Sequence, residues 1–226
     1  MCYSYEQSRN NLIINIITCS ILYNYKNNQI YKILALIFGY IGIMQLFDMI
    51  FWSTQNIKDP YNAKVNFITT KIAMFVNHAQ PLVLAYIIYS FIGKLGMLSL
   101  LILLIYILVI LIYTYYAYYK ISYTLVKNKY IKSHNYTVTP SRYGLHWSWN
   151  YEPQYKLVYS IFLLALIILS YENLPNPFNI ILTLIFIISF LFSRYYFKKQ
   201  SFGRWWCKVV AYIPIFLIML DYLKVI

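Results

Sequence analysis

The 226-residue sequence contains few charged residues and few cysteines, and each shortage excludes a class of protein. Charged residues make up 11% of the chain, well below the roughly 25% of an ordinary soluble domain. The three cysteines, Cys2, Cys19 and Cys207, are scattered and form neither a disulfide framework nor a zinc-binding pattern. Apolar residues are abundant instead, with 61% hydrophobic and 20% aromatic residues, and this composition predicts an integral membrane protein.

The net charge of +13 comes from 19 basic and 6 acidic residues. Nearly all of the basic residues lie in short connections between apolar runs, which favours the lipid bilayer and its anionic head groups as their partner. Nucleic acid is therefore not expected as a partner, because basic loops beside membrane spans are explained by the bilayer itself.

Seven apolar segments approach the length of about 20 residues that a membrane-spanning helix needs. They predict an all-α fold, a polytopic transmembrane helix bundle that forms a single domain over residues 1–226. The predicted spans are 11–24, 31–54, 66–90, 95–119, 155–171, 178–197 and 205–225, with a basic connection at 120–154. The first segment is the shortest, so the sequence leaves open whether it crosses the bilayer fully.

The distribution of Lys and Arg predicts the orientation. With seven spans, fourteen of these residues fall on the side of the N-terminus and of the connection 120–154, and four fall on the other side. Because connections rich in Lys and Arg stay in the cytoplasm, we expect a cytoplasmic N-terminus. In the same connection, Trp147 and Trp149 are interpreted as interfacial anchors, with a short hairpin or re-entrant piece as the alternative.

The segment 66–90 is the most polar of the seven and is the candidate functional segment. Polar side chains at membrane depth normally face the interior of a bundle or a wet cavity, and they therefore mark a site. Helical spacing predicts an amide and hydroxyl stripe of Asn66, Thr69, Thr70, Asn77 and Gln80, and a basic stripe of Lys71 and His78.

Pro81 predicts a kink in this segment. Proline has no N–H group and crowds the carbonyl four residues earlier, which is that of Asn77, so this carbonyl loses its intrahelical partner. In lipid the freed carbonyl must find a partner on a neighbouring helix, on a side chain or in water. We therefore expect a polar site between Asn77 and Pro81.

Asp48, in the second predicted span, is expected to be the acidic residue deep in the membrane, where it must be neutralised or paired. Our hypothesis is that Asp48 and Gln45 face the third span and share a hydrogen-bonded network with His78 or Asn77. The alternative is that these groups only fasten two helices together. Four further residues are expected around the site: Trp52, Lys71, Trp205 and Cys207.

The sequence offers few groups for catalysis or for a cofactor. No second His or Cys lies within helical reach of His78, so neither a metal site nor a cofactor is expected. One deep His, one deep Asp and scattered hydroxyls are a poor set for an intramembrane hydrolase. A retinal protein would need a lysine in the middle of the last span, whereas Lys208 and Lys224 lie at its ends. We therefore expect a protein that is not an enzyme.

Four short motifs are distinctive: Cys2-Tyr3-Ser4, Met44-Gln45 with Asp48 one turn later, the run from Asn66 to Pro81, and the Gly-Arg-Trp-Trp-Cys run at 203–207. Together they resemble a family of uncharacterised seven-span membrane proteins encoded by giant DNA viruses of the mimivirus group. The sequence departs from the family at Arg204, where a small residue is expected. The resemblance implies the fold, the topology and a viral origin, in a host or virion membrane, and it implies no biochemical activity.

Two functions of different classes are expected from these observations. The first is passage or sensing of a small ion or polar solute through a polar interior, because broken helices with freed carbonyls bind ions at membrane depth. The second is a non-catalytic role in organising membranes, with partners recruited through the connection 120–154. A lipid-modifying intramembrane enzyme is a third alternative. The sequence does not indicate an oligomeric state.

Overall fold

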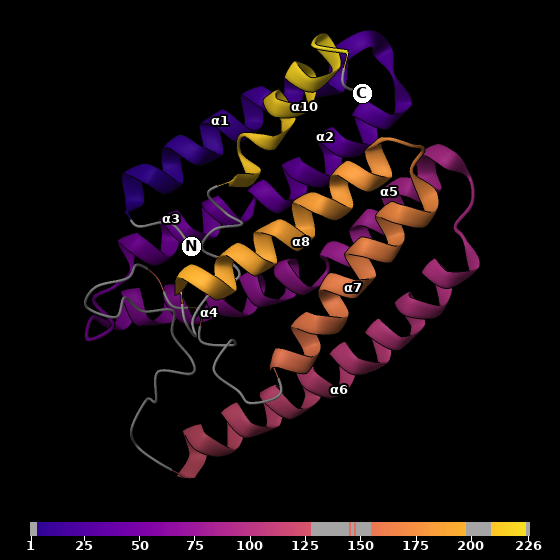
Figure 1. Cartoon of the computed structure of the whole chain (residues 1–226). Coiled ribbons are helices and arrows are strands. Elements are labelled where there is room, and N and C mark those ends of the chain that lie inside the picture. The colour runs from indigo at the N-terminus through magenta and orange to yellow at the C-terminus, as the bar shows by residue number, and fades with distance from the viewer. Residues whose placement is uncertain (1–3, 128–144, 146, 148–154, 198–208, 225–226) are drawn as a thin grey trace.

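The computed structural model describes residues 4–127, 145, 147, 155–197 and 209–224, and the regular elements in these ranges are helices (Figure 1). The all-α prediction is therefore confirmed for this part of the chain. In chain order the elements are α1 (Tyr5–Asn24), the 3₁₀ turn η1 (Tyr25–Asn27), α2 (Gln29–Gly42), α3 (Met44–Ser53), α4 (Pro60–His78), α5 (Gln80–Ile92), α6 (Met97–Lys127), α7 (Tyr155–Asn173), α8 (Phe178–Phe197) and α10 (Ile213–Tyr222).

Two helical segments in the described ranges are long and apolar enough to cross a bilayer. They are Gln29–Ser53, which joins α2 and α3, and Met97–Tyr115 in α6. The pair α4 and α5 is a third candidate if the two bent helices count as one span. These helices are compatible with a membrane protein, and the prediction of seven spans with a cytoplasmic N-terminus stays a prediction.

Short-range chemistry explains where several of these helices begin and end. The Ser4 hydroxyl accepts a hydrogen bond from the Gln7 N–H at 3.1 Å and caps α1. The Asp59 carboxylate accepts one from the Asn62 N–H at 3.0 Å and caps α4, whose first turn contains Pro60. Both residues satisfy amide groups that a helix start leaves unpaired.

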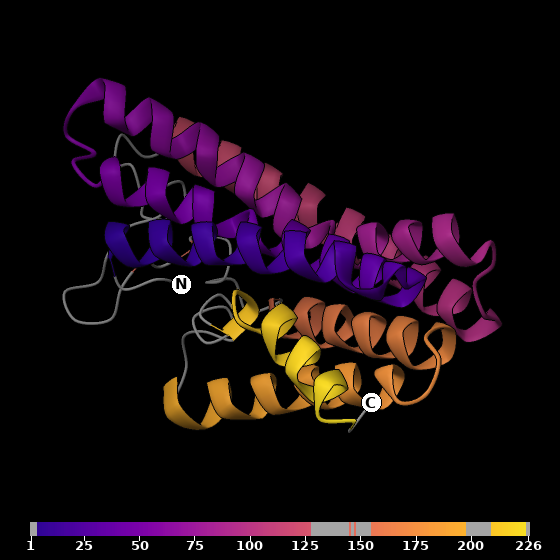
Figure 2. The same cartoon turned by 90° about the horizontal axis from the view of Figure 1, so that it is seen from above.

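The helices pack lengthwise around one main apolar core. Helix α1 lies against α2, α3 and α10, while α7 lies between α6 and α8. In Figure 2 the orange and yellow helices α7, α8 and α10 lie on one side of the indigo-to-magenta helices. Fully buried residues of the core include Leu22, Phe38, Leu84, Leu169 and Phe186, which come from five different helices.

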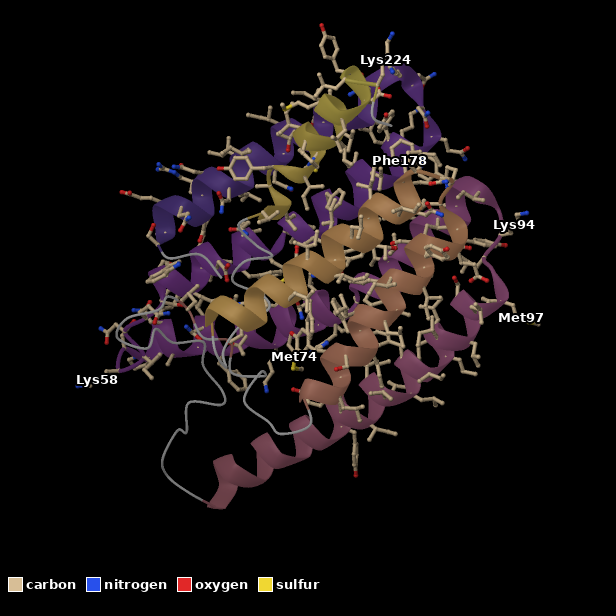
Figure 3. The ribbon with its side chains drawn as sticks, viewed as in Figure 1. Lys58, Met74, Lys94, Met97, Phe178 and Lys224 are labelled. Atoms are coloured by element: carbon tan, nitrogen blue, oxygen red, sulfur yellow. The ribbon has the colours of Figure 1, made fainter. Side chains whose placement is uncertain are left out.

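The connections between helices gather at two opposite ends of the bundle. At one end Lys26, after α1, forms an ion pair with Asp221 of α10. At the same end, which carries Lys94 and Lys224 in Figure 3, the α5–α6 and α7–α8 connections meet. Figure 3 places Lys58, before α4, at the opposite end. Lys58 and Lys94 therefore lie at different ends of the bundle, and the predicted orientation in a membrane stays a prediction.

Helix α1 buries several polar residues and exposes a row of isoleucines. Its buried face includes Ser8, Asn11, Asn15 and Thr18, whereas Ile13, Ile16, Ile17 and Ile21 are exposed. A helix on the surface of a soluble protein has the opposite arrangement. Exposed isoleucines beside buried amides are favourable where the surroundings are hydrocarbon, because each polar group must then be satisfied inside the bundle.

Candidate polar site at the helix break

The predicted kink is present at the junction of α4 and α5. Helix α4 ends at His78, Ala79 lies between the two helices, and α5 begins at Gln80 with Pro81 in its first turn. The two helix axes are bent by 48° at this point. The break follows from Pro81, which cannot donate the hydrogen bond that would continue the α4 ladder.

Two tyrosine hydroxyls from other helices donate to backbone carbonyls in the last turn of α4. Tyr40 of α2 donates to the Val76 carbonyl at 3.1 Å, and Tyr106 of α6 donates to the His78 carbonyl at 2.6 Å. Sequence analysis expected the Asn77 carbonyl to need a new partner, and the tyrosines bind the carbonyls on either side of it. Tyr106 could have been noticed, because it is the only hydroxyl-bearing residue between positions 100 and 112.

The side chains at the break form a polar cluster with aromatic neighbours. The Asn77 amide donates to the Tyr159 hydroxyl of α7 at 2.8 Å, and the Gln80 amide donates to the Asn77 side-chain oxygen at 3.5 Å. The ring centroid of His78 lies 5.6 Å from that of Tyr159 and 5.8 Å from that of Tyr113 of α6. Figure 3 labels Met74, one helical turn before His78 on α4.

Three buried polar atoms in this cluster have no hydrogen-bond partner in the part of the chain that the structure describes. They are both ring nitrogens of His78 and the Oε1 atom of Gln80. His78 is 5% exposed and Gln80 is 1% exposed. Because a buried polar atom without a partner costs on the order of 1–3 kcal/mol, three such atoms in two residues only two positions apart are unusual in a region that only holds helices together.

Asp48 lies in a different cluster from His78, so the hypothesis of a shared network is wrong. The Asp48 carboxyl is fully buried, and its Oδ1 atom accepts a hydrogen bond from the Trp147 indole N–H at 3.1 Å. Asn77 uses its amide on Tyr159, and the His78 nitrogens have no described partner. The physical reason is that an indole from the α6–α7 connection reaches Asp48 and supplies the donor that sequence analysis sought on the third span.

Trp147 is therefore not the interfacial anchor that sequence analysis favoured. Its side chain is 2% exposed and packs with Leu145, Met44, Phe51 and Ala73 in a small apolar cluster between α3 and α4. Within the range 120–154, residues 120–127 belong to α6, and Leu145 and Trp147 are buried against other helices. Trp149 lies outside the described residues.

Asn66 of α4 forms hydrogen bonds to the residue that ends α3, and Thr70 of α4 forms a hydrogen bond to Asn66. The Asn66 amide donates to the Thr54 carbonyl at 3.3 Å and to the Thr54 hydroxyl at 3.1 Å. The Thr70 hydroxyl donates to the Asn66 side-chain oxygen at 3.4 Å. Eleven residues separate Asn66 from Asn77, which is about 16 Å along a helix, so these residues are not part of the cluster at the break.

The remaining predicted residues are placed as follows. Gln45 is buried on α3, three residues before Asp48. The Lys71 ammonium lies 5.3 Å from the ring centroid of Phe67, on α4 itself. Trp52 packs against the Trp147 cluster, and its indole N–H has no partner among the described residues. Trp205 and Cys207 lie outside the described residues.

Searches of family models, curated proteins and solved structures found no match to the chain. The resemblance to the giant-virus family therefore stays a prediction. Within the described residues, no group of three or more His, Cys, Asp or Glu side chains could hold a metal ion. Asn77, His78, Gln80 and the tyrosines that contact them are the remaining candidate site.

Proposed function

We propose that the protein is a multi-pass integral membrane protein that binds a small polar species at the α4–α5 break and uses this site for passage or sensing. The observation that carries the proposal is the set of unpartnered atoms on His78 and Gln80, both of which are at least 95% buried. A bound ligand would satisfy these atoms, and their desolvation would then be compensated.

The position of the cluster supports the proposal. Its residues come from α4, α5, α6 and α7, so a ligand at the break would contact four helices at once. Discontinuous helices at the centre of a bundle are a recurring place for solute sites in membrane proteins, because the break frees polar groups where no lipid reaches them. A change at such a site can also alter how the helices pack, as sensing would require.

Helix faces support a membrane setting. On α4 and α5, Ile72, Phe75, Tyr86 and Tyr89 are exposed, while Asn66, Thr69, Thr70, Asn77, His78 and Gln80 are buried. Exposed apolar side chains over such lengths need hydrocarbon to cover them. The lipid bilayer is therefore the proposed partner of these faces.

The alternative role, organisation of membranes through the 120–154 connection, receives less support. Leu145 and Trp147 are buried against α3 and α4, where they are not available to a partner protein. The connection would have to act through residues other than these two.

The proposal is tested by measuring passage and binding with the purified protein. Passage is followed by stopped-flow light scattering of proteoliposomes challenged with urea, glycerol, NaCl or KCl. Binding is followed in nanodiscs by the ¹⁵N resonances of labelled histidine, with the His78 signals assigned by the His78→Phe variant. Phenylalanine keeps the ring and removes both nitrogens.

We expect at least one solute to cross faster than in protein-free vesicles or to shift the His78 resonances. The His78→Phe variant should lose the effect on passage. The matched control is Tyr86→Phe, which removes a hydroxyl that is 72% exposed on the outer face of α5 and should leave passage unchanged. If no solute in the panel crosses or shifts the resonances, the proposed function is wrong.

A further inference from the structure

We infer that the species bound at the α4–α5 break is an uncharged solute bearing N–H or O–H groups, and not a metal cation or another ion. The inference rests on the proposed function and names the chemical class of its ligand. Three properties of the break carry it. They are the hydrogen bonds on the Val76 and His78 carbonyls, the absence of formal charge in the cluster, and the donor and acceptor atoms of His78 and Gln80 that have no described partner.

The carbonyls on either side of the one that Pro81 frees each accept a hydrogen bond from a tyrosine hydroxyl. A cation at a broken membrane helix is usually coordinated by unwound backbone carbonyls at the helix end. Here the Tyr40 hydroxyl donates to the Val76 carbonyl and the Tyr106 hydroxyl donates to the His78 carbonyl. Each hydroxyl uses one of the two lone pairs of its carbonyl oxygen. A cation on the same oxygen would lie beside the positive end of the hydroxyl dipole, which weakens its coordination.

The side chains of the cluster carry no acidic group that could neutralise a cation. Asn77, His78, Gln80 and Tyr159 contact one another, and the buried Asp48 carboxyl is bonded to Trp147 instead. An ion moved from water into such surroundings without a counter-charge costs several kcal/mol or more. The net charge of +13 further opposes cation entry.

An anion is opposed by the same lack of charge. Lys71 precedes His78 by seven residues, about 10 Å along the helix, and its ammonium lies over the Phe67 ring. No basic side chain among the described residues therefore bonds to the cluster atoms that lack partners. The cluster has nothing to pair with a carboxylate or a phosphate.

The unpartnered atoms fit a neutral molecule that both donates and accepts. A neutral imidazole presents one N–H donor and one acceptor nitrogen, and Gln80 Oε1 is a further acceptor. The rings of Tyr113 and Tyr159 beside His78 supply apolar walls for a small carbon or amide framework. Urea, a small amide, a polyol or water itself has the matching groups, whereas Na⁺ and K⁺ have no acceptor for the imidazole N–H and would leave it unpaired.

The test compares neutral solutes with ions on the same preparation. Urea and glycerol permeation is measured by light scattering of proteoliposomes, and ion passage is measured as current across planar bilayers in NaCl and in KCl. The variants are Gln80→Leu and His78→Phe, with Tyr86→Phe as the control. Circular dichroism and size-exclusion chromatography verify that each variant is folded.

We expect neutral-solute permeation, or water permeation alone, that falls to the protein-free rate in Gln80→Leu and is retained in Tyr86→Phe, without ion current. An ion current that is lost in Gln80→Leu would overturn the inference and leave the proposed function standing. Absence of both permeation and current, with unchanged His78 resonances, would overturn both. If the variants do not fold, the wild-type resonances decide: a shift with urea supports the inference, and a shift with KCl alone contradicts it.

Discussion

The hydrogen bond between Asp48 and Trp147 joins residues 99 positions apart and makes a quantitative prediction. A hydrogen bond contributes a net of about 0.5–1.5 kcal/mol, or about 1.5–3 kcal/mol when one group is charged. Polar contacts between membrane helices average about 0.6 kcal/mol. The 3.1 Å distance is long for a charge-assisted bond. We therefore expect a coupling free energy of about 1 kcal/mol between the two side chains.

The perturbation is a double-mutant cycle of Asp48→Leu and Trp147→Phe. Each single variant removes this hydrogen bond and changes a buried side chain, and it should lower the free energy of unfolding by about 1–3 kcal/mol. The double variant should lose about 1 kcal/mol less than the sum of the two. Asp48→Asn should lose less than Asp48→Leu, because the amide oxygen can still accept from the indole.

Unfolding is measured in mixed micelles by titration with sodium dodecyl sulfate, followed by far-ultraviolet circular dichroism. The matched control is Trp52→Phe. Trp52 packs against the same cluster, but its indole N–H has no partner among the described residues. Its replacement should change stability by no more than about 0.5 kcal/mol. A coupling energy of zero, or equal losses for Trp52→Phe and Trp147→Phe, would refute the reasoning.

Three further predictions concern Gly96, Glu172 and Asn135. A Cβ on Gly96 would meet the carboxyl group of Glu172, the far end of a flexible side chain. Gly96→Ala should therefore displace this group from its hydrogen bonds to Ser99 and destabilise by about 1–3 kcal/mol. Gly39→Ala, whose Cβ would meet its nearest atom at 3.9 Å, should not. The Ser99 hydroxyl donates to the Glu172 carboxylate and lowers the pKa of Glu172. The stability that this hydrogen bond contributes is therefore complete above the pKa of about 4.3 that an unfolded Glu has. It is lost as the pH falls through the lowered pKa, and Glu172→Gln should flatten this part of the unfolding profile. Finally, Asn135-Tyr136-Thr137 is a glycosylation sequon in the connection predicted to be cytoplasmic. Asn135 should therefore remain unglycosylated in a eukaryotic host, as gel mobility with and without glycosidase will show. A glycan there would mean that the predicted orientation is inverted.

Local rules predicted the helix break well. Pro81 removes an N–H group wherever the chain goes, so the end of α4 at His78 follows from a covalent property of one residue. The polar stripe on α4 was also readable, because helical spacing fixes which residues share a face. Asn66, Thr70, Asn77 and Gln80 are all buried, as polar side chains of an intramembrane helix should be.

The partners of these residues were not predictable, and some expectations were wrong. Sequence analysis paired Asp48 with the third span, because a base was present there, and interpreted Trp147 as an interfacial anchor. An indole is equally consistent with a membrane interface and with a buried donor. The choice depends on whether a carboxyl oxygen lies within reach. Likewise, the sequence contains 27 tyrosines. Tyr106 is the only hydroxyl-bearing residue between positions 100 and 112, but nothing local indicates that it or Tyr40 binds a carbonyl in the last turn of α4.

The sequence by itself determined that the chain is helical and apolar and that α4 breaks before Pro81, because composition, periodicity and the missing proline N–H act over a few residues. Tertiary structure alone decided which polar groups meet. It brought the Trp147 indole to Asp48 and two tyrosine hydroxyls to carbonyls of α4. The ring nitrogens of His78 have no partner among the described residues. The physical reason is that a hydrogen bond needs two atoms within about 3.5 Å. Between residues distant in the chain, that distance is set by the packing of whole helices.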